Sequence, residues 1–309
     1  MLTWVIGAGG LFGQALVRGS DNVFHAQRLP WEDEIAALAA LSESLSAFRR
    51  QAPEDWTIIW AAGHATTSSS PEQTAAELRL FTAFIEHLKQ NTPSGKGVFG
   101  LTSSAGGVYA GSSDPPFTSS TTPVPLSAYG HLKLDQERIA QTLSPEIPVV
   151  SLRLSNLYGP GQNLTKLQGI ISHLALAAIT RNPINIFVPL DTLRDYIYVD
   201  DAALQAIHWI NEAQLSQQSS LRVVASGLPQ TIGRVVSIMT SMAHARIPIA
   251  FGYSSSAEYQ AHDLRLIPDR YSQTALLNKT PLPVGAKLVL DDLVYRHARA
   301  QVKADAPHS

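Results

Sequence analysis

The residues best spaced for acid–base chemistry in this chain are Tyr129 and Lys133, which lie four positions apart. On a helix this spacing places both side chains on one face, one turn apart. A phenol has an ordinary pKa of about 10, so it is a poor acid or base near neutral pH unless a nearby ammonium group favours the phenolate. Such a pair could transfer a proton in alcohol–ketone chemistry. The same spacing also decorates solvated helix faces, so the assignment depends on finding a cofactor site and a substrate site.

The composition excludes several classes of function. The chain has 309 residues and a net charge of −2 at pH 7 without a basic run, so no nucleic-acid partner is expected. It has no cysteine, which removes disulfides, thiolate metal sites and cysteine nucleophiles and fits a reducing cytoplasm. The ten histidines show no ligand spacing, so no metal is expected. No segment is long and apolar enough to span a bilayer, so no membrane partner is expected.

The elements that must position the pair alternate between strands and helices, which predicts an α/β fold with a parallel, doubly wound sheet. The expected strands are Leu2–Ile6, Asn22–His25, Trp56–Ala62, Gly97–Ser103, Pro148–Leu154, Ile184–Val188 and Leu221–Ala225. The expected helices are Leu11–Arg18, Glu34–Arg50, Pro71–Gln90, Ser127–Leu143, Leu164–Thr180 and Val199–Asn211. Ser127 is a candidate N-cap for the helix that carries the pair.

A glycine-rich turn follows the first strand and leads into the first helix. It comprises Gly7, Gly9, Gly10 and Gly13, with Leu11 and Phe12 opening the helix. Glycines allow a tight turn and a close backbone approach to a pyrophosphate, and the helix N-terminus supplies free N–H groups. The position of this turn between strand and helix therefore predicts a dinucleotide-binding site.

The residues that would choose between NAD and NADP give no single answer. A NAD site usually has Asp or Glu at the end of the second strand, where it binds the ribose hydroxyls. The stretch from Val23 to Arg28 has no carboxylate, and Arg28 could instead meet a 2′-phosphate. Arg28 could equally be a surface arginine, so the sequence does not decide between NAD and NADP as the cofactor.

Several motifs follow one another along the chain: the glycine triple Gly7, Gly10 and Gly13, the segments Trp60–Gly63 and Thr102–Tyr109, the pair Tyr129 and Lys133, and the segments Leu152–Gly161 and Arg194–Asp201. Together they resemble the extended short-chain dehydrogenases/reductases, also called the NAD-dependent epimerase/dehydratase family. The resemblance runs from the start of the chain to about residue 240. It implies a dinucleotide-binding Rossmann domain at 1–160, joined by about 192–240, and a smaller, interleaved substrate domain at 161–191 and 241–309.

The resemblance also implies roles for individual residues around the reacting oxygen. Tyr129 would act as the general acid/base on a sugar hydroxyl or ketone. Lys133 would bind the nicotinamide ribose and favour the phenolate. Ser104 would hydrogen-bond the reacting oxygen, with Ser103 as a rival because the loop that follows is one residue longer than in the shortest family forms.

Other positions would contact the cofactor and the substrate. Ala61, Ala62 and Gly63 would lie along the cofactor. Asn156 would lie near the substrate, and Arg194 would bind the substrate's diphosphate, for which a guanidinium fork is suited. An ion pair with the adjacent Asp195 is the structural alternative for Arg194.

Absences within these motifs narrow the reaction. Family dehydratases carry Asp-Glu directly after the catalytic Thr, whereas this chain has Ala105, Gly106 and Gly107, which disfavours dehydration and decarboxylation. Enzymes resembling GDP-fucose synthase use a cysteine that is absent here. A nucleotide-sugar 4-epimerase is the leading interpretation. The alternatives are a nucleotide-sugar 4-ketoreductase, a reductase of a non-nucleotide carbonyl, and a non-catalytic dinucleotide-binding regulator.

Two further expectations come from the resemblance. The Gly-Asp-Gly turn that often precedes the Arg-Asp segment is replaced here by Phe187–Leu193, so the loop lining the sugar-nucleotide site is altered. Family members often pair through two long helices per subunit, and the candidates here are Pro71–Gln90 and Ser127–Leu143. A homodimer is therefore predicted.

Overall fold

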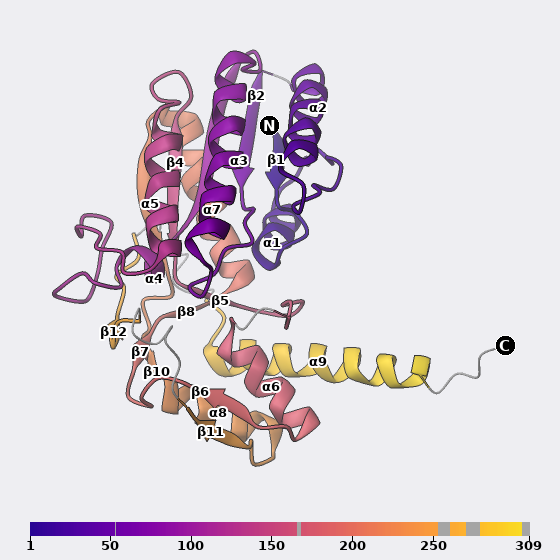
Figure 1. The fold of residues 1–309 in the computed structure, drawn as a ribbon, viewed down its shortest axis with the longest axis vertical. Coiled ribbons are helices and arrows are strands. Elements are labelled where there is room, and N and C mark those ends of the chain that lie inside the picture. The colour runs from indigo at the N-terminus through magenta and orange to yellow at the C-terminus, as the bar shows by residue number, and fades with distance from the viewer. Residues whose placement is uncertain (53, 166–167, 253–259, 270–278, 305–309) are drawn as a thin grey trace.

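A central sheet of five parallel strands carries the ends from which the predicted site residues emerge (Figure 1). Its strands are β1 (Leu2–Ile6), β2 (Asp55–Trp60), β3 (Lys96–Ser104), β4 (Val149–Leu154) and β9 (Ser220–Val224), hydrogen-bonded in that order and all parallel. This computed structural model describes residues 1–52, 54–165, 168–252, 260–269 and 279–304, with side chains as far as residue 300. The predicted doubly wound α/β fold is confirmed.

Helices cover both faces of this sheet, which explains why β1, β2, β3 and β4 are buried along almost their whole length. On one face, α2 (Glu34–Gln51), α3 (Pro71–Gln90) and α5 (Ala128–Gln141) bury an aromatic-rich core. On the other face, α1 (Leu11–Gly19) and α7 (Val199–Ser216) pack against the same strands. Each helix that carries a predicted site residue is thereby fixed to the sheet.

The helix of the tyrosine–lysine pair starts where the sequence predicts. The side chain of Ser127 accepts a hydrogen bond from the backbone N–H of Gly130 at 3.1 Å, which confirms the predicted N-cap. The neighbouring α3 begins with a capping box, in which Ser70 and Gln73 each accept from the other's backbone N–H. These caps set where Tyr129 and Lys133 lie relative to α3.

A second, smaller layer lies beyond the carboxyl ends of the sheet strands (Figure 1). Its hydrophobic core is built mainly by α6 (Ile170–Thr180), α8 (Ile232–Ala243) and α9 (Leu282–Ala304). Beside them pair β6 (Ile184–Ile186) with β11 (Ile249–Phe251), β5 (Asn156–Tyr158) with β8 (Tyr196–Tyr198), and β7 (Leu193–Arg194) with β10 (Gln230–Thr231) and β12 (Asp263–Leu264). Residues 232–240 thus pack with the smaller layer, and the predicted domain boundaries stay a prediction.

Two expected elements differ most from their predicted bounds. The stretch Asn22–His25 forms only an isolated bridge between Val23 and Thr3, although Phe24 still packs edge-on against Trp4. The helix expected from Leu164 begins only at Ile170, because Gly169 adopts a left-handed backbone with φ of 93° immediately before it. Residues 166 and 167 lie outside the described part of the chain. None of the helices described is long and apolar enough to cross a membrane.

Candidate active site

A cleft of about 1490 Å³ runs along the carboxyl ends of the sheet strands and into the smaller layer. This edge of an open α/β sheet is where ligands ordinarily bind. Thirteen of the predicted site residues line it: Gly7, Gly9, Gly10, Leu11, Arg28, Ala61, Ala62, Gly63, Ser103, Ser104, Tyr129, Asn156 and Arg194. The other three predicted site residues do not line the cleft and are buried: Phe12, Gly13 and Lys133.

The glycine turn has the shape of a phosphate cradle. Gly7 has a φ of 94°, and a Cβ at Gly13 would lie 2.1 Å from the carbonyl oxygen of Gly7. The helix can therefore lie this close to the turn only because both positions are glycine. A Cβ at Gly9, in contrast, would meet nothing within 4 Å. The N-cap of α1 is Gly10, which offers no side chain to the first N–H groups. These free donors fit the pyrophosphate of a dinucleotide, while Phe12 packs in the core beneath.

The charge of the cleft favours anionic ligands. None of the described residues that line it is Asp or Glu, whereas Arg28 and Arg194 both line it. Arg28 is exposed at the end of the segment that follows the isolated bridge. Arg194 lies on β7, in the smaller layer, and is only 6% exposed. Two cations and no carboxylate would suit a ligand that carries phosphate at both ends of the cleft.

Arg194 is a buried cation without an ion pair among the described residues. Burial lowers the pKa of its guanidinium. The side chain donates to the Leu193 carbonyl at 2.8 Å and to the Gln260 side chain at 3.4 Å. The alternative partner, Asp195, instead accepts hydrogen bonds from the 226–228 turn. This guanidinium lines the cleft, and no carboxylate of the described residues forms an ion pair with it, although Asp263 acts on its charge over a longer distance.

Asn156 reaches the same side of the cleft from β5. Its backbone and side-chain nitrogens both donate to the Asp195 carbonyl, at 3.2 and 2.9 Å. These bonds tie β5 to β8 and leave the side-chain oxygen of Asn156 available to a ligand.

The two candidate serines differ in how their hydroxyls are used. Ser103 donates to Glu137 at 2.6 Å, and that carboxylate is also paired with Arg153 at 2.6 Å. Ser104 caps the short helix α4 (Ala105–Val108) and accepts from the N–H of Gly107 at 3.1 Å. A hydroxyl that only accepts keeps its hydrogen for a ligand oxygen. The geometry therefore favours Ser104 as the donor to a substrate.

Tyr129 stands over the end of α4 and lines the cleft. A Cβ at Gly107 would lie 3.1 Å from the Tyr129 ring, so the ring rests directly on this glycine. The ammonium nitrogen of Lys133 lies 5.6 Å from the centre of the same ring. The predicted placement of the pair on one helix face is therefore present in the structure.

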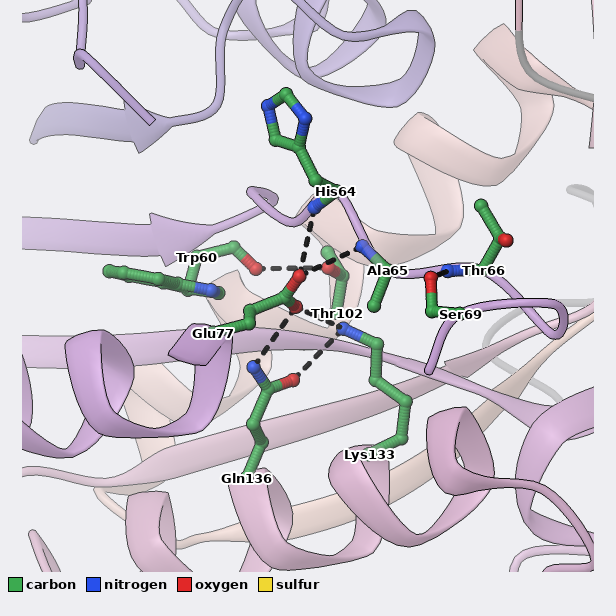
Figure 2. A network of polar contacts seen from close by, with 9 residues as sticks. All are labelled: Trp60, His64, Ala65, Thr66, Ser69, Glu77, Thr102, Lys133 and Gln136. Atoms are coloured by element: carbon green, nitrogen blue, oxygen red, sulfur yellow. Dashed lines mark hydrogen bonds and ion pairs between the residues drawn. The ribbon is translucent and has the colours of Figure 1, made fainter. Parts of the chain in front are cut away.

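Lys133 is held by two residues that the sequence reasoning missed (Figure 2). Its nitrogen donates to the side-chain oxygen of Gln136 at 2.9 Å and lies 3.7 Å from a carboxylate oxygen of Glu77. A usable signal existed for Glu77. Thr74, Glu77, Phe81 and Phe84 recur at helical spacing, which places a carboxylate on the buried face of α3.

The amino-acid sequence is similar to those of known proteins. A sequence model described as the NAD dependent epimerase/dehydratase family matches residues 4–221. Over 100 residues the chain is 35% identical to dTDP-4-dehydro-6-deoxyglucose reductase of Escherichia coli, covering 32% of each chain. Over 86 residues it is 38% identical to dTDP-L-rhamnose 4-epimerase of Burkholderia thailandensis, covering 27% of this chain and 24% of the relative. The matches thus span about a third or less of these relatives.

Solved structures share the fold over nearly the whole chain. The structure of MoeE5 in complex with UDP-glucose and NAD has a TM-score of 0.77 at 20% identity, covering 96% of this chain and 100% of that one. UDP-glucose 4-epimerase of Thermus thermophilus in complex with NAD has a TM-score of 0.74 at 19% identity, covering 95% and 99%. RMD from Pseudomonas aeruginosa in complex with NADPH has a TM-score of 0.72 at 19% identity, covering 96% and 98%. The glycine turn, the parallel sheet and the match over residues 4–221 agree: this chain belongs to the NAD-dependent epimerase/dehydratase family.

Proposed function

We propose that this protein binds NAD or NADP and epimerises a nucleotide sugar at C4. The observation that carries the proposal is the cleft itself. It joins a glycine cradle, a tyrosine and a buried arginine in one space, and no carboxylate is among its described lining residues. A nucleotide sugar and a dinucleotide are both diphosphates, so this lining suits the two together. The similarity to a dTDP-sugar 4-epimerase and a dTDP-sugar reductase supports the same substrate class.

The residues would divide the chemistry as follows. A bound nicotinamide supplies reversible hydride transfer at the sugar carbon. Tyr129 removes the proton from the C4 hydroxyl and returns it when the carbonyl is reduced on its other face. Ser104 donates its hydroxyl hydrogen to the same oxygen, and Lys133 holds positive charge beside the phenol. Arg194 binds the substrate's diphosphate, which anchors the nucleotide while the sugar turns.

The short helix α4 supports a reaction without a second acid or base. Ala105, Gly106 and Gly107 form this helix beneath Tyr129, and none of them can move a proton. Elimination of water across two carbons would need such groups in addition to the tyrosine. Proton transfer at a single carbon needs only Tyr129.

A nucleotide-sugar 4-ketoreductase is the second candidate. The similarity to dTDP-4-dehydro-6-deoxyglucose reductase favours it. The two reactions differ in whether the cofactor is consumed. An epimerase regenerates its cofactor in each turnover, whereas a reductase oxidises one reduced cofactor for each product.

Purified protein tests this directly. The protein would be loaded with one equivalent of NAD, freed of excess cofactor and incubated with UDP- and dTDP-hexoses, with products followed by NMR. Interconversion of C4 epimers over many turnovers supports the epimerase. Turnover that occurs only with 4-keto sugars and added NADPH supports the reductase, and no turnover with either class overturns both.

A further inference from the structure

Glu77 is a buried carboxylate that touches both the wall of the cleft and the lysine of the catalytic pair (Figure 2). It lies on α3, and its side chain is only 6% exposed. A carboxylate is costly to bury unless its oxygens are paired with donors or cations. Each oxygen of Glu77 has such partners, and the two oxygens serve different parts of the site.

One oxygen fastens the strand-end segment that follows β2. It accepts hydrogen bonds from the backbone N–H groups of His64 and Ala65, at 2.8 and 2.9 Å. Ala61, Ala62, Gly63 and His64 line the cleft just before this point. The helix thereby holds the backbone that forms the cofactor side of the cleft.

The other oxygen faces the lysine. It lies 3.7 Å from the Lys133 nitrogen and accepts from the Gln136 amide at 3.4 Å, while Gln136 accepts from Lys133 at 2.9 Å. Gln136 is fully buried and lies one turn after Lys133 on α5. The three side chains form a closed triangle, so the ammonium has two fixed partners, one on α3 and one on α5.

The backbone beside Glu77 is shaped to admit it. Gly63 has a φ of 150°, and a Cβ there would lie 2.6 Å from the Glu77 oxygen that faces Lys133. Only a glycine leaves room for the carboxylate to reach past the strand end. The close approach at Gly63 and the hydrogen bonds from the N–H groups of His64 and Ala65 leave the Glu77 carboxylate little room to move.

We propose that Glu77 is a positioning residue of the active site. Its one carboxylate holds the Lys133 ammonium at a fixed position relative to the segment that follows β2 and lines the cleft. This inference rests on the proposed function, because it assigns Lys133 to the catalytic pair. It follows that turnover requires a negative charge beside Lys133, whether a residue of α3 or a residue of α5 carries that charge. Gln136, whose side-chain oxygen already accepts from Lys133 at 2.9 Å, occupies a second position from which a carboxylate could meet the same ammonium.

The test compares Glu77→Gln with the double variant Glu77→Gln/Gln136→Glu. Glu77→Gln keeps the shape and an acceptor oxygen but removes the charge. We expect kcat to fall tenfold or more while the substrate KM changes less than threefold. The double variant returns a carboxylate to the triangle and should recover kcat to within about threefold of wild type. Glu137→Gln is the matched control. It removes an equally buried carboxylate from α5 and should lower the melting temperature with little loss of kcat.

A second readout needs no turnover. Acylation of Lys133 requires its nitrogen to leave Glu77 and Gln136, so mass spectrometry should find faster labelling of Lys133 in Glu77→Gln and slow labelling again in the double variant. If wild type turns over no nucleotide sugar but this labelling pattern holds, the proposed function fails and the positioning role stands. Wild-type kcat and wild-type labelling in Glu77→Gln, or a double variant no better than the single one, would overturn the inference.

Discussion

Hydroxyl groups at the end of β3 differ in how much of their hydrogen-bonding capacity is already committed. Ser103 donates into the buried pair of Glu137 and Arg153, whereas Ser104 only accepts from a backbone N–H. Two adjacent serines of the same type are therefore assigned different tasks by their partners. The sequence leaves them as rivals, because their order along the strand does not reveal which hydroxyl is already used.

Ser104→Ala should lower kcat about tenfold to a hundredfold, since it removes a donor to the reacting oxygen. It should also cost about 1 kcal/mol of stability, because Ser104 caps α4. Ser103→Ala should cost about 1 kcal/mol of stability through its lost hydrogen bond and leave most of kcat. Steady-state kinetics and thermal unfolding of the two variants check this. A larger kcat loss in Ser103→Ala would reverse the assignment.

Arg28 bears on the choice of dinucleotide. It lies on the cleft wall where a ribose-binding carboxylate is missing from the described lining. Arg28→Ala should weaken NADPH binding tenfold or more and NADH binding less than threefold, as measured by fluorescence titration. Arg50→Ala, an exposed arginine at the end of α2, is the control. Equal losses for both dinucleotides would show that Arg28 does not contact a 2′-phosphate.

At the scale of elements, the turn between β1 and α1 separates packing from binding. Gly13 cannot accept a Cβ because the Gly7 carbonyl would lie 2.1 Å away, while a Cβ at Gly9 meets nothing within 4 Å. The sequence treats both as members of one glycine pattern. Only the structure distinguishes Gly13, which packs against the turn, from Gly9, which lines the open cleft.

Gly13→Ala should therefore lower the melting temperature strongly and reduce cofactor binding with it. Gly9→Ala should melt within a few degrees of wild type yet bind the dinucleotide at least tenfold more weakly, because the methyl group enters the cleft. Calorimetric unfolding and cofactor titration measure the two effects. Tight cofactor binding by Gly9→Ala would contradict the proposed location of the pyrophosphate.

Strongly periodic or continuous apolar segments are predictable from the sequence, and most of the fold consists of them. The predicted range Pro71–Gln90 agrees with α3 at both ends. The start is well marked, because a proline is favoured at the first position of a helix and a capping box precedes it. The expected helix from Leu164 fails at its beginning, since Gly169 takes a left-handed backbone. The helical spacing of Glu77 with Phe81 and Phe84 places its carboxylate on the buried face of α3, but it does not show what the carboxylate binds there. Its buried role depends on Lys133, which is more than fifty residues away in the sequence.

At the scale of the whole molecule, several buried tyrosines couple stability to alkaline pH. Burial raises the pKa of Tyr196 to about 12, and it also raises the pKa of Tyr158 and Tyr109. A raised pKa in the folded state means that stability is complete below the unfolded pKa near 10 and is lost as pH rises toward 12.

Between pH 9 and pH 11, Tyr196 alone should account for a loss of about 1 kcal/mol of unfolding free energy. Tyr196→Phe should make the decline with pH shallower by that amount, with the exposed Tyr295→Phe as the matched control. Denaturant titrations at the two pH values measure this. Identical declines in wild type and Tyr196→Phe would contradict the coupling.

The homodimer expected from the sequence would use the outer faces of α3 and α5. The inner faces of both helices are occupied by the sheet, where Phe81, Phe84 and Ala140 join one core. None of the large hydrophobic side chains exposed on the described surface belongs to either helix. Such a dimer would pack small and charged side chains, and it stays a prediction.

Proton transfer at Tyr129 is the step on which the proposed reaction in the cleft depends. The most direct measurement compares wild type with Tyr129→Phe, each loaded with NAD, for interconversion of C4-epimeric nucleotide sugars followed by NMR. We expect Tyr129→Phe to bind NAD within about threefold of wild type and to lose at least a thousandfold in turnover, a loss that corresponds to about 4 kcal/mol of barrier. Wild-type turnover in Tyr129→Phe would contradict the account.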